Sequence, residues 1–314
     1  MKTPALLCAA ALAASLAPAE LATRYEAEKA VRVTCETTLS METTASEFLR
    51  DGEPIEGRGG SGGGGREEAR RSVHVDRWLD CADGRPARVR RSWQEVEGDL
   101  EMDFGGESRG FALESPFEDV AVEIGRDEDG DLSWEVVEGS DPGQEGLERL
   151  RPELALDALL PYGEVAEGDS WDLEAEAIAR ALGLDLADVL LRRPDPGEGQ
   201  GGGGRGGRGG RGGGSRGGGS SLGQLAGAEW TGKASFEGEV EFEGTRCALI
   251  ELELEAESEM DGEGMTRTFE AELEGRLYVD LEARRPLALE VEGDLRTEMD
   301  SERERQGMLI EMHR

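Results

Sequence analysis

Hydrophobic side chains recur at every second position over long stretches near both ends of this chain. In the second half, Ile250, Leu252 and Leu254 alternate with glutamates, and the same spacing continues through residues 269–281 and 287–295. Successive side chains of a strand point to opposite faces of a sheet, so a period of two predicts strands with one buried face. Alternation with charged residues is typical of antiparallel sheets. We therefore expect mainly antiparallel β-structure.

The first part of the chain carries the same period. Val31, Val33 and Cys35 alternate with polar residues, and a second alternating stretch covers residues 73–81. The segment between them, residues 51–66, is polar and rich in glycine, so we expect a flexible loop there. The two alternating stretches then form a hairpin.

The register of this hairpin predicts a disulfide. If Arg50 lies opposite Arg66, paired residue numbers sum to 116, and Cys35 falls opposite Cys81. Directly opposed cysteines lie within bonding range in a non-hydrogen-bonded pair. The alternative is that both are small apolar core residues. Cys247 remains as a free thiol that is buried, reactive or paired with another chain.

Two further patterns extend the β prediction. A mirror pattern that places Val122 opposite Trp134 predicts a hairpin around the turn at residues 126–131. The order Val-Asp, Arg-Pro, Glu-Gly-Asp-Leu occurs within residues 75–100 and again within residues 279–295. This echo suggests two similar β lobes.

The middle of the chain changes to a helical period. Leucines and alanines recur every three or four positions over residues 147–158, with Pro152 at a break, and again over residues 175–182, where Gly183 supplies a C-terminal stop. Residues 197–223 are almost entirely Gly, Arg and Ser, which cannot bury enough surface to order the chain. We expect a disordered linker there.

The N-terminal segment predicts export. Lys2 precedes an apolar run at residues 6–16, and Ala17-Pro18-Ala19 forms a small-x-small cleavage site. The run is too short to span a bilayer, and no later stretch approaches about 18 apolar residues. We therefore expect a periplasmic or extracellular protein without a transmembrane segment.

The fold class that follows is mainly β (α+β): two antiparallel, curved β-meander lobes that flank a short helical segment. The last strand pattern begins at Met308 and is cut off by Arg314, so we expect a truncated C-terminal lobe. The signal peptide, N-terminal lobe, helical segment, linker and C-terminal lobe are placed at residues 1–19, 20–140, 141–196, 197–223 and 224–314, respectively.

The charge of the chain limits its partners. With 70 acidic and 35 basic residues, the formal net charge is -35. Nucleic-acid binding depends on basic neutralisation of phosphates, so we expect no nucleic-acid partner, and self-repulsion favours a monomer. The arginine–glycine runs at Arg205, Arg208 and Arg211 resemble RNA-binding segments, but a tether, or a basic strand on the protein's own acidic surface, fits better.

The sequence predicts no catalytic, cofactor or metal site. His74 and His313 lack a metal-ligand or triad spacing, and His74 falls on the polar face of its strand, where we expect it to be solvated. The acidic turn at residues 127–131 resembles part of an EF-hand loop. In that alignment Gly125 and Val136 would occupy the first and twelfth positions, which must supply calcium ligands, so a hairpin turn is favoured. Paired carboxylates occur everywhere in so acidic a chain, so a hydrolase is the weakest hypothesis. We expect the protein not to be an enzyme.

One resemblance can be stated. The long alternating strands, the Asp and Arg-Pro turns, and the link from Leu160-Pro161 to Gly168-Asp169-Ser170-Trp171 resemble uncharacterised exported bacterial proteins of the domain-of-unknown-function type. More distantly, they resemble the curved half-barrel sheets of lipoprotein-carrier-like proteins. The likeness covers about residues 28–312 and includes no specific motif. It implies a concave sheet that could hold an apolar ligand.

The leading hypothesis is therefore a non-enzymatic binding or carrier module for an apolar small molecule. The alternative is an envelope structural protein or protein-interaction scaffold. The acidic surface, the odd thiol of Cys247 and the Gly/Arg linker suggest this alternative.

Overall fold

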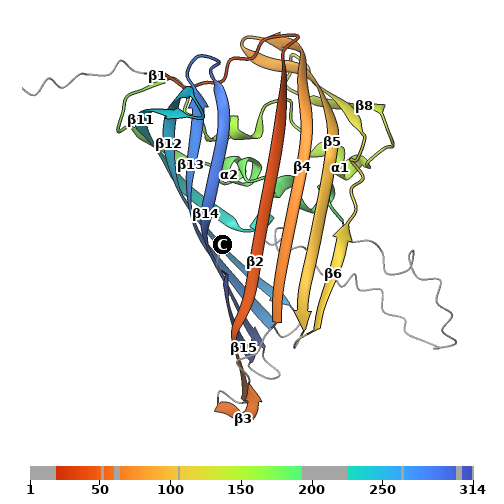
Figure 1. Cartoon of the computed structure of the whole chain (residues 1–314), viewed down its shortest axis with the longest axis vertical. Helices are drawn as coiled ribbons and strands as arrows, with labels where there is room; N and C mark the ends of the chain where they lie inside the picture. The colour runs from red at the N-terminus through yellow and green to blue at the C-terminus, as the bar shows by residue number, and fades with distance from the viewer. Residues whose placement is uncertain are drawn as a thin grey trace, which may run out of the picture.

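The computed structural model describes residues 19–50, 53–59, 64–104, 107–192, 225–262, 265–301 and 306–312. It is mainly β, with antiparallel strands and a few short helices, as the sequence predicts (Figure 1). The predicted signal segment up to residue 18, the linker at residues 197–223 and His313 lie outside the described residues.

The elements follow the chain as two groups of strands around a helical segment. The first group comprises β1 (Ala19–Glu20), β2 (Ala30–Arg50), β3 (Glu53–Gly59), β4 (Gly64–Ala82), β5 (Arg85–Phe104), β6 (Glu107–Leu113), β7 (Ala121–Arg126) and β8 (Leu132–Glu138). The middle contains α1 (Gln144–Glu148), η1 (Ala155–Leu159), β9 (Glu164–Val165), β10 (Ser170–Leu173), α2 (Ala175–Ala181), η2 (Leu184–Leu186) and α3 (Ala187–Leu190). The second group comprises β11 (Glu229–Phe242), β12 (Thr245–Gly262), β13 (Met265–Asp280), β14 (Arg285–Ser301) and β15 (Gln306–Met312).

The two meanders are halves of one curved sheet. Its order is β10-β11-β12-β13-β14-β15-β2-β4-β5-β7-β8, with β3 beside β2 and β6 beside β5, and β1 and β9 form a separate pair. The join is β15, which pairs with β14 at residues 295–297 and with β2 between residues 42 and 48. Across the described residues, the end strands β10 and β8 do not pair with each other, so the sheet is open. The period of two predicts these strands but not which edges meet.

Both predicted hairpins form, but in different registers. Cys35 lies opposite Ser72, so β2 and β4 pair with a sum of 107. The observed sum differs from the predicted sum of 116 by nine, which is an odd number. The inner side chains of β2 therefore lie beside the face of β4 opposite to the one expected. In the second hairpin, Val122 lies opposite Val136, an even shift of two that preserves the faces. The acidic segment between β7 and β8 is a hairpin turn, as predicted, in which the Asp127 carboxylate accepts backbone N–H bonds.

The predicted Cys35–Cys81 disulfide is wrong. Cys81 lies opposite Pro86 at the far end of β4, and Cys35, Cys81 and Cys247 are all free thiols. The physical reason is the glycine-rich segment, which does not act as a symmetric loop. Part of it forms β3 and pairs back onto β2, and β4 already begins at Gly64, so the hairpin register moves.

The helical segment lies across the concave face of the sheet (Figure 1). Pro152 separates α1 from η1, and Gly183 takes the left-handed conformation (φ 68°) directly after α2, both as predicted. A glycine reaches this conformation without the steric cost that a side chain would bring.

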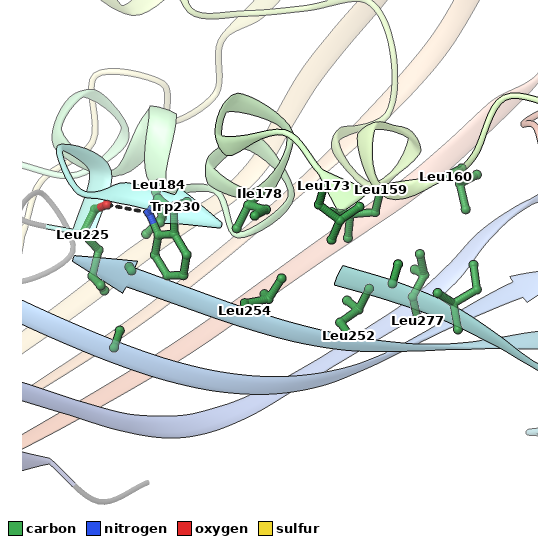
Figure 2. Close-up of a cluster of buried hydrophobic side chains, with 14 of the residues drawn as sticks. Leu159, Leu160, Leu173, Ile178, Leu184, Leu225, Trp230, Leu252, Leu254 and Leu277 are labelled. Carbon is green, nitrogen blue, oxygen red and sulfur yellow. Dashed lines mark hydrogen bonds between the residues drawn. The ribbon is translucent and has the colours of Figure 1, made fainter. Parts of the chain in front are cut away.

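Two hydrophobic cores fix the helical segment to the two halves of the sheet. In the first, α2 and η1 pack on the C-terminal strands, with Ile178 facing Leu254 and Leu159 near Leu252 and Leu277 (Figure 2). The indole of Trp230 donates a hydrogen bond to the carbonyl of Leu225 at the edge of this core. The second core joins β5, β7 and β8 to α1 through buried residues that include Trp93, Phe117, Val122, Ile124, Leu147 and Leu150.

Candidate functional site

A cavity of about 590 Å³ lies between the two cores, where the helical segment spans the junction of β2 and β14. We call it the seam cavity. Its volume falls in the range of small-molecule sites, which is roughly 300–1,000 Å³. The two cores lie on either side of it, and residues of both cores form part of its wall.

The edges of two strands border the seam cavity without pairing. In the part of the chain that the structure describes, no strand pairs with β2 on the side away from β4 over residues 30–41, nor with β14 on the side away from β13 over residues 285–294. The two strands meet at β15 and diverge from there (Figure 1). Residues of both edges line the seam cavity, which therefore opens sideways through the sheet.

The segment that leads into β2 closes the other end of this opening. The backbone N–H of Arg24 donates to the carbonyl of Arg284, and the Arg284 guanidinium forms an ion pair with Glu20 at 2.6 Å. Further along, the N–H of Glu28 donates to the carbonyl of Trp78 on β4. The segment thus ties the start of β14 to the first half of the sheet.

The lining of the seam cavity is largely apolar. Leu287 is one of its residues and is 39% exposed, a high value for a large hydrophobic side chain. Exposed apolar surface of this kind marks binding grooves when it is contiguous. The apolar lining residues include Val31, Val33 and Leu39 of β2, Leu287, Leu289, Val291 and Leu295 of β14, and Leu182, Leu184, Leu186 and Leu190 of the helical segment.

Arginine is concentrated around the same cavity. Among the described residues, eight arginines and four acidic residues line it, whereas the whole chain has twice as many acidic as basic residues. The arginines are Arg32, Arg70, Arg71, Arg91, Arg149, Arg151, Arg180 and Arg285, and the acidic residues are Glu36, Asp76, Glu153 and Asp185. The seam cavity therefore differs in charge from the rest of this acidic protein.

A buried ion pair forms the polar floor of the seam cavity. The Arg91 guanidinium of β5 donates two hydrogen bonds of 2.7 Å to the carboxylate of Asp76 on β4, and both side chains are buried. This two-pronged geometry is the strongest form of the pair, and it compensates for removing both charges from water. Arg91 also lies 6.0 Å from the ring of Trp93. The pair holds β4 and β5 together at the cavity wall.

His74 also faces the seam cavity, so its predicted place on a solvated face is wrong. Burial, and then the positive charge of Arg91, lower the pKa of His74 to about 4. Its Nε2 lies 3.8 Å from Asp76 Oδ1, beyond hydrogen-bond length, and among the described residues no serine or cysteine is hydrogen bonded to it. His74 is therefore neutral at pH 7 and is not oriented as a general base.

Three arginines reach the seam cavity from the helical segment. Arg149 directly follows α1 and donates to the backbone carbonyl of Asp185 at 2.8 Å, which links α1 to η2. Arg151 lies between α1 and η1, and Arg180 lies in the last turn of α2. Burial raises the pKa of Asp185 to about 6, although the charges of Arg180 and Arg151 favour its ionised form.

Asp157 of η1 anchors the N-terminal segment beside this group. Its carboxylate accepts hydrogen bonds from the hydroxyls of Thr23 and Tyr25, and the Tyr25 hydroxyl oxygen accepts the backbone N–H of Leu154. Burial raises the pKa of Asp157 to about 7. This network holds the helical segment against the chain that enters β2.

The structure separates the three cysteines that the sequence singles out. Cys35 lies on β2, lines the seam cavity and is exposed. Cys81 is half-buried outside the cavity lining, and Cys247 is fully buried on β12. Its burial leaves Cys247 inaccessible to another chain in the folded state.

The sequence analysis did not identify the arginines of the seam cavity. Three of them, Arg149, Arg151 and Arg180, interrupt the helical leucine pattern. Because they lie between apolar residues that pack inwards, their positions could have indicated arginines at a buried site. Asp76 did appear in the internal repeat, but its counterpart Asp280 accepts backbone N–H bonds in the β13–β14 turn instead. The repeat thus indicated two long hairpins and not a shared site.

The outer face of the C-terminal half is strongly acidic. Glu272 lies directly opposite Glu255 on one side and Asp294 on the other, and Glu274 lies opposite Glu253 and Glu292. Among the described residues, no three His, Cys, Asp or Glu side chains come together in a way that could hold a metal ion. None of the helices in the described ranges has the length and hydropathy needed to cross a membrane.

Comparison with known proteins gives no relative for this arrangement. No family model matches the chain, and no curated protein or solved structure matches it either. The resemblance to exported domains of unknown function and to lipoprotein-carrier-like sheets therefore stays a prediction.

Proposed function

We propose that this protein is a non-enzymatic binding or carrier module for an apolar ligand that occupies the seam cavity. The observation that carries the proposal is the cavity itself, which lies between the two cores. Burial of apolar surface in such a site stabilises a complex by roughly 25 cal/mol per Å² before the costs of association.

The unpaired edges of β2 and β14 support this proposal. A long chain-like ligand could enter sideways between the two strands without separating any backbone hydrogen bonds, because none joins them over residues 30–41 and 285–294 in the described structure. The scaffold alternative has less support, since one of its three reasons was the thiol of Cys247, which is buried.

Binding can be tested by filling the cavity. We expect the uncharged dye N-phenylnaphthylamine to gain fluorescence with the purified protein and to be displaced by dodecanol. Leu289→Trp places an indole in the cavity and should abolish this gain. Glu290→Trp is the matched control, because the neighbouring side chain is exposed and does not line the cavity. Equal dye binding by both variants would refute the proposed site.

The cysteines give a second readout without mutation. Dodecanol should slow the alkylation of Cys35 by a maleimide, because Cys35 lines the cavity. Cys81 is the internal control and should react at an unchanged rate, while Cys247 should react only after unfolding. The measurement is mass spectrometry of the labelled peptides, and equal protection of Cys35 and Cys81 would count against the cavity.

A further inference from the structure

We propose that the ligand of the seam cavity is a single-chain amphiphile with an anionic headgroup, and that Arg151 and Arg180 bind this headgroup. This inference rests on the proposed function and adds the chemical class of the ligand. It follows from how the charges around the cavity are distributed.

Several arginines of the cavity wall are already neutralised. Arg91 is bound by both oxygens of Asp76, and Arg70 lies 2.6 Å from the buried carboxylate of Glu68. Arg149 forms an ion pair with Glu145 at 3.1 Å, which water screens in part because the Glu145 side chain is 68% exposed. These pairs hold the wall together and leave less positive charge for a ligand.

Arg151 is held in place without being neutralised. Its Nη1 donates to the backbone carbonyls of Glu148 and Leu150, at 2.7 and 3.0 Å. In the described part of the chain no carboxylate forms an ion pair with it. The carbonyl contacts fix the direction of the guanidinium, so its charge is preorganised beside the cavity.

Among the described residues, Arg180 has only a weak ion-pair partner. Its Nη2 lies 3.8 Å from Glu176, whose side chain is 81% exposed, so water screens this pair strongly. The positive charges of Arg151 and Arg180 both favour the ionised form of Asp185, and the charge of Arg180 also favours the ionised form of Asp157. At pH 7 Asp185, with a pKa of about 6, is mostly ionised and Asp157, with a pKa of about 7, is about half ionised, so these two carboxyls offset the charge of the two guanidinium groups only in part.

The surroundings of this charge select an amphiphile. A guanidinium presents five N–H donors in a planar fork that matches carboxylate and phosphate oxygens. Leucines at 182, 184 and 186 line the cavity directly after Arg180 in the chain, and apolar residues of β2 and β14 line its other side. An anion with one hydrocarbon chain would satisfy both parts of this lining.

The test compares three ligands of one chain length. Dodecanoate, dodecanol and dodecylamine are titrated against the dye-loaded protein. We expect dodecanoate to bind about tenfold or more tightly than dodecanol, as charge-assisted hydrogen bonds imply, and dodecylamine to bind most weakly. The variant Arg151→Gln/Arg180→Gln should bind acid and alcohol within about threefold of each other. Arg246→Gln removes one positive charge outside the cavity, where Arg246 pairs with Glu239, and should keep the preference.

The outcomes separate this inference from the proposed function. If the dye and dodecanol bind but dodecanoate binds no more tightly than dodecanol, the headgroup inference fails and the apolar site stands. If the double variant keeps the full preference for the acid, the anion binds elsewhere and the inference also fails. If none of the ligands binds, both proposals fail. Should the double variant not fold, the comparison of dodecanoate with dodecanol on the native chain still decides whether the anionic headgroup adds affinity. The variant Arg151→Lys/Arg180→Lys keeps both charges and should retain part of the preference for the acid.

Discussion

Replacing Asp76 by Asn should destabilise the protein strongly. The substitution keeps the size of the side chain but removes the negative charge that faces the buried Arg91 guanidinium. Asp76 is 0% exposed and both of its oxygens accept hydrogen bonds of 2.7 Å. Loss of one member of a buried pair costs about 3–5 kcal/mol, because the remaining charge stays buried without a partner. We expect the lower end, about 3 kcal/mol, since Asp185 and Glu153 also act on Arg91.

The assay is urea unfolding followed by tryptophan fluorescence, to which Trp93 beside Arg91 contributes. Arg91→Met alone and with Asp76→Asn completes a double-mutant cycle, and we expect the double variant to recover at least about 2 kcal/mol relative to the sum of the single changes. Glu239→Gln breaks the exposed pair with Arg246 and should cost less than about 1 kcal/mol. A loss below about 1 kcal/mol for Asp76→Asn would refute the structural role of the pair.

Two further predictions concern charge. The pKa of His74 falls from 6.5 to about 4 on folding, so the unfolded chain binds the proton first as the pH falls, and the free energy of unfolding should decrease by about 3 kcal/mol between pH 6.5 and 4 from this group alone. Asp157 and Asp185 have raised pKa values, so their effect on stability has the opposite dependence on pH. The measured quantity is therefore the difference in the free energy of unfolding between the native chain and His74→Gln. A difference that does not change with pH would contradict the lowered pKa of His74. Glu272→Thr removes like charges that face each other across three strands and should stabilise by about 0.5 kcal/mol at low salt, with a smaller gain at high salt; a gain that is independent of salt would exclude repulsion as its cause.

Local features of the fold could be predicted from the sequence. Ile250, Leu252 and Leu254 are buried while the glutamates between them are exposed, because a strand's period of two depends only on neighbouring positions. Gly183 ends α2 for an equally local reason, since its left-handed backbone suits a residue without a side chain.

Features that depend on distant parts of the chain could not be predicted in this way. The pairing of β15 with both β14 and β2 joins the two meanders, and nothing in the alternation indicates it. On β4, Val73 is buried, but Asp76 on the opposite face is buried as well. The rule that polar positions face water fails there, because Asp76 forms an ion pair with the buried Arg91 in the wall of the seam cavity.

The placement of β15 has a consequence for the order of folding. It pairs with β2 across about 260 residues of intervening chain, so this contact closes a very long loop and should form late. Until then each meander is a half-sheet with a bare edge, which another copy of the chain could cover. A nascent chain should therefore acquire its interior compartment only in the last step of folding, after the strand that is synthesised last among those described has joined the two halves.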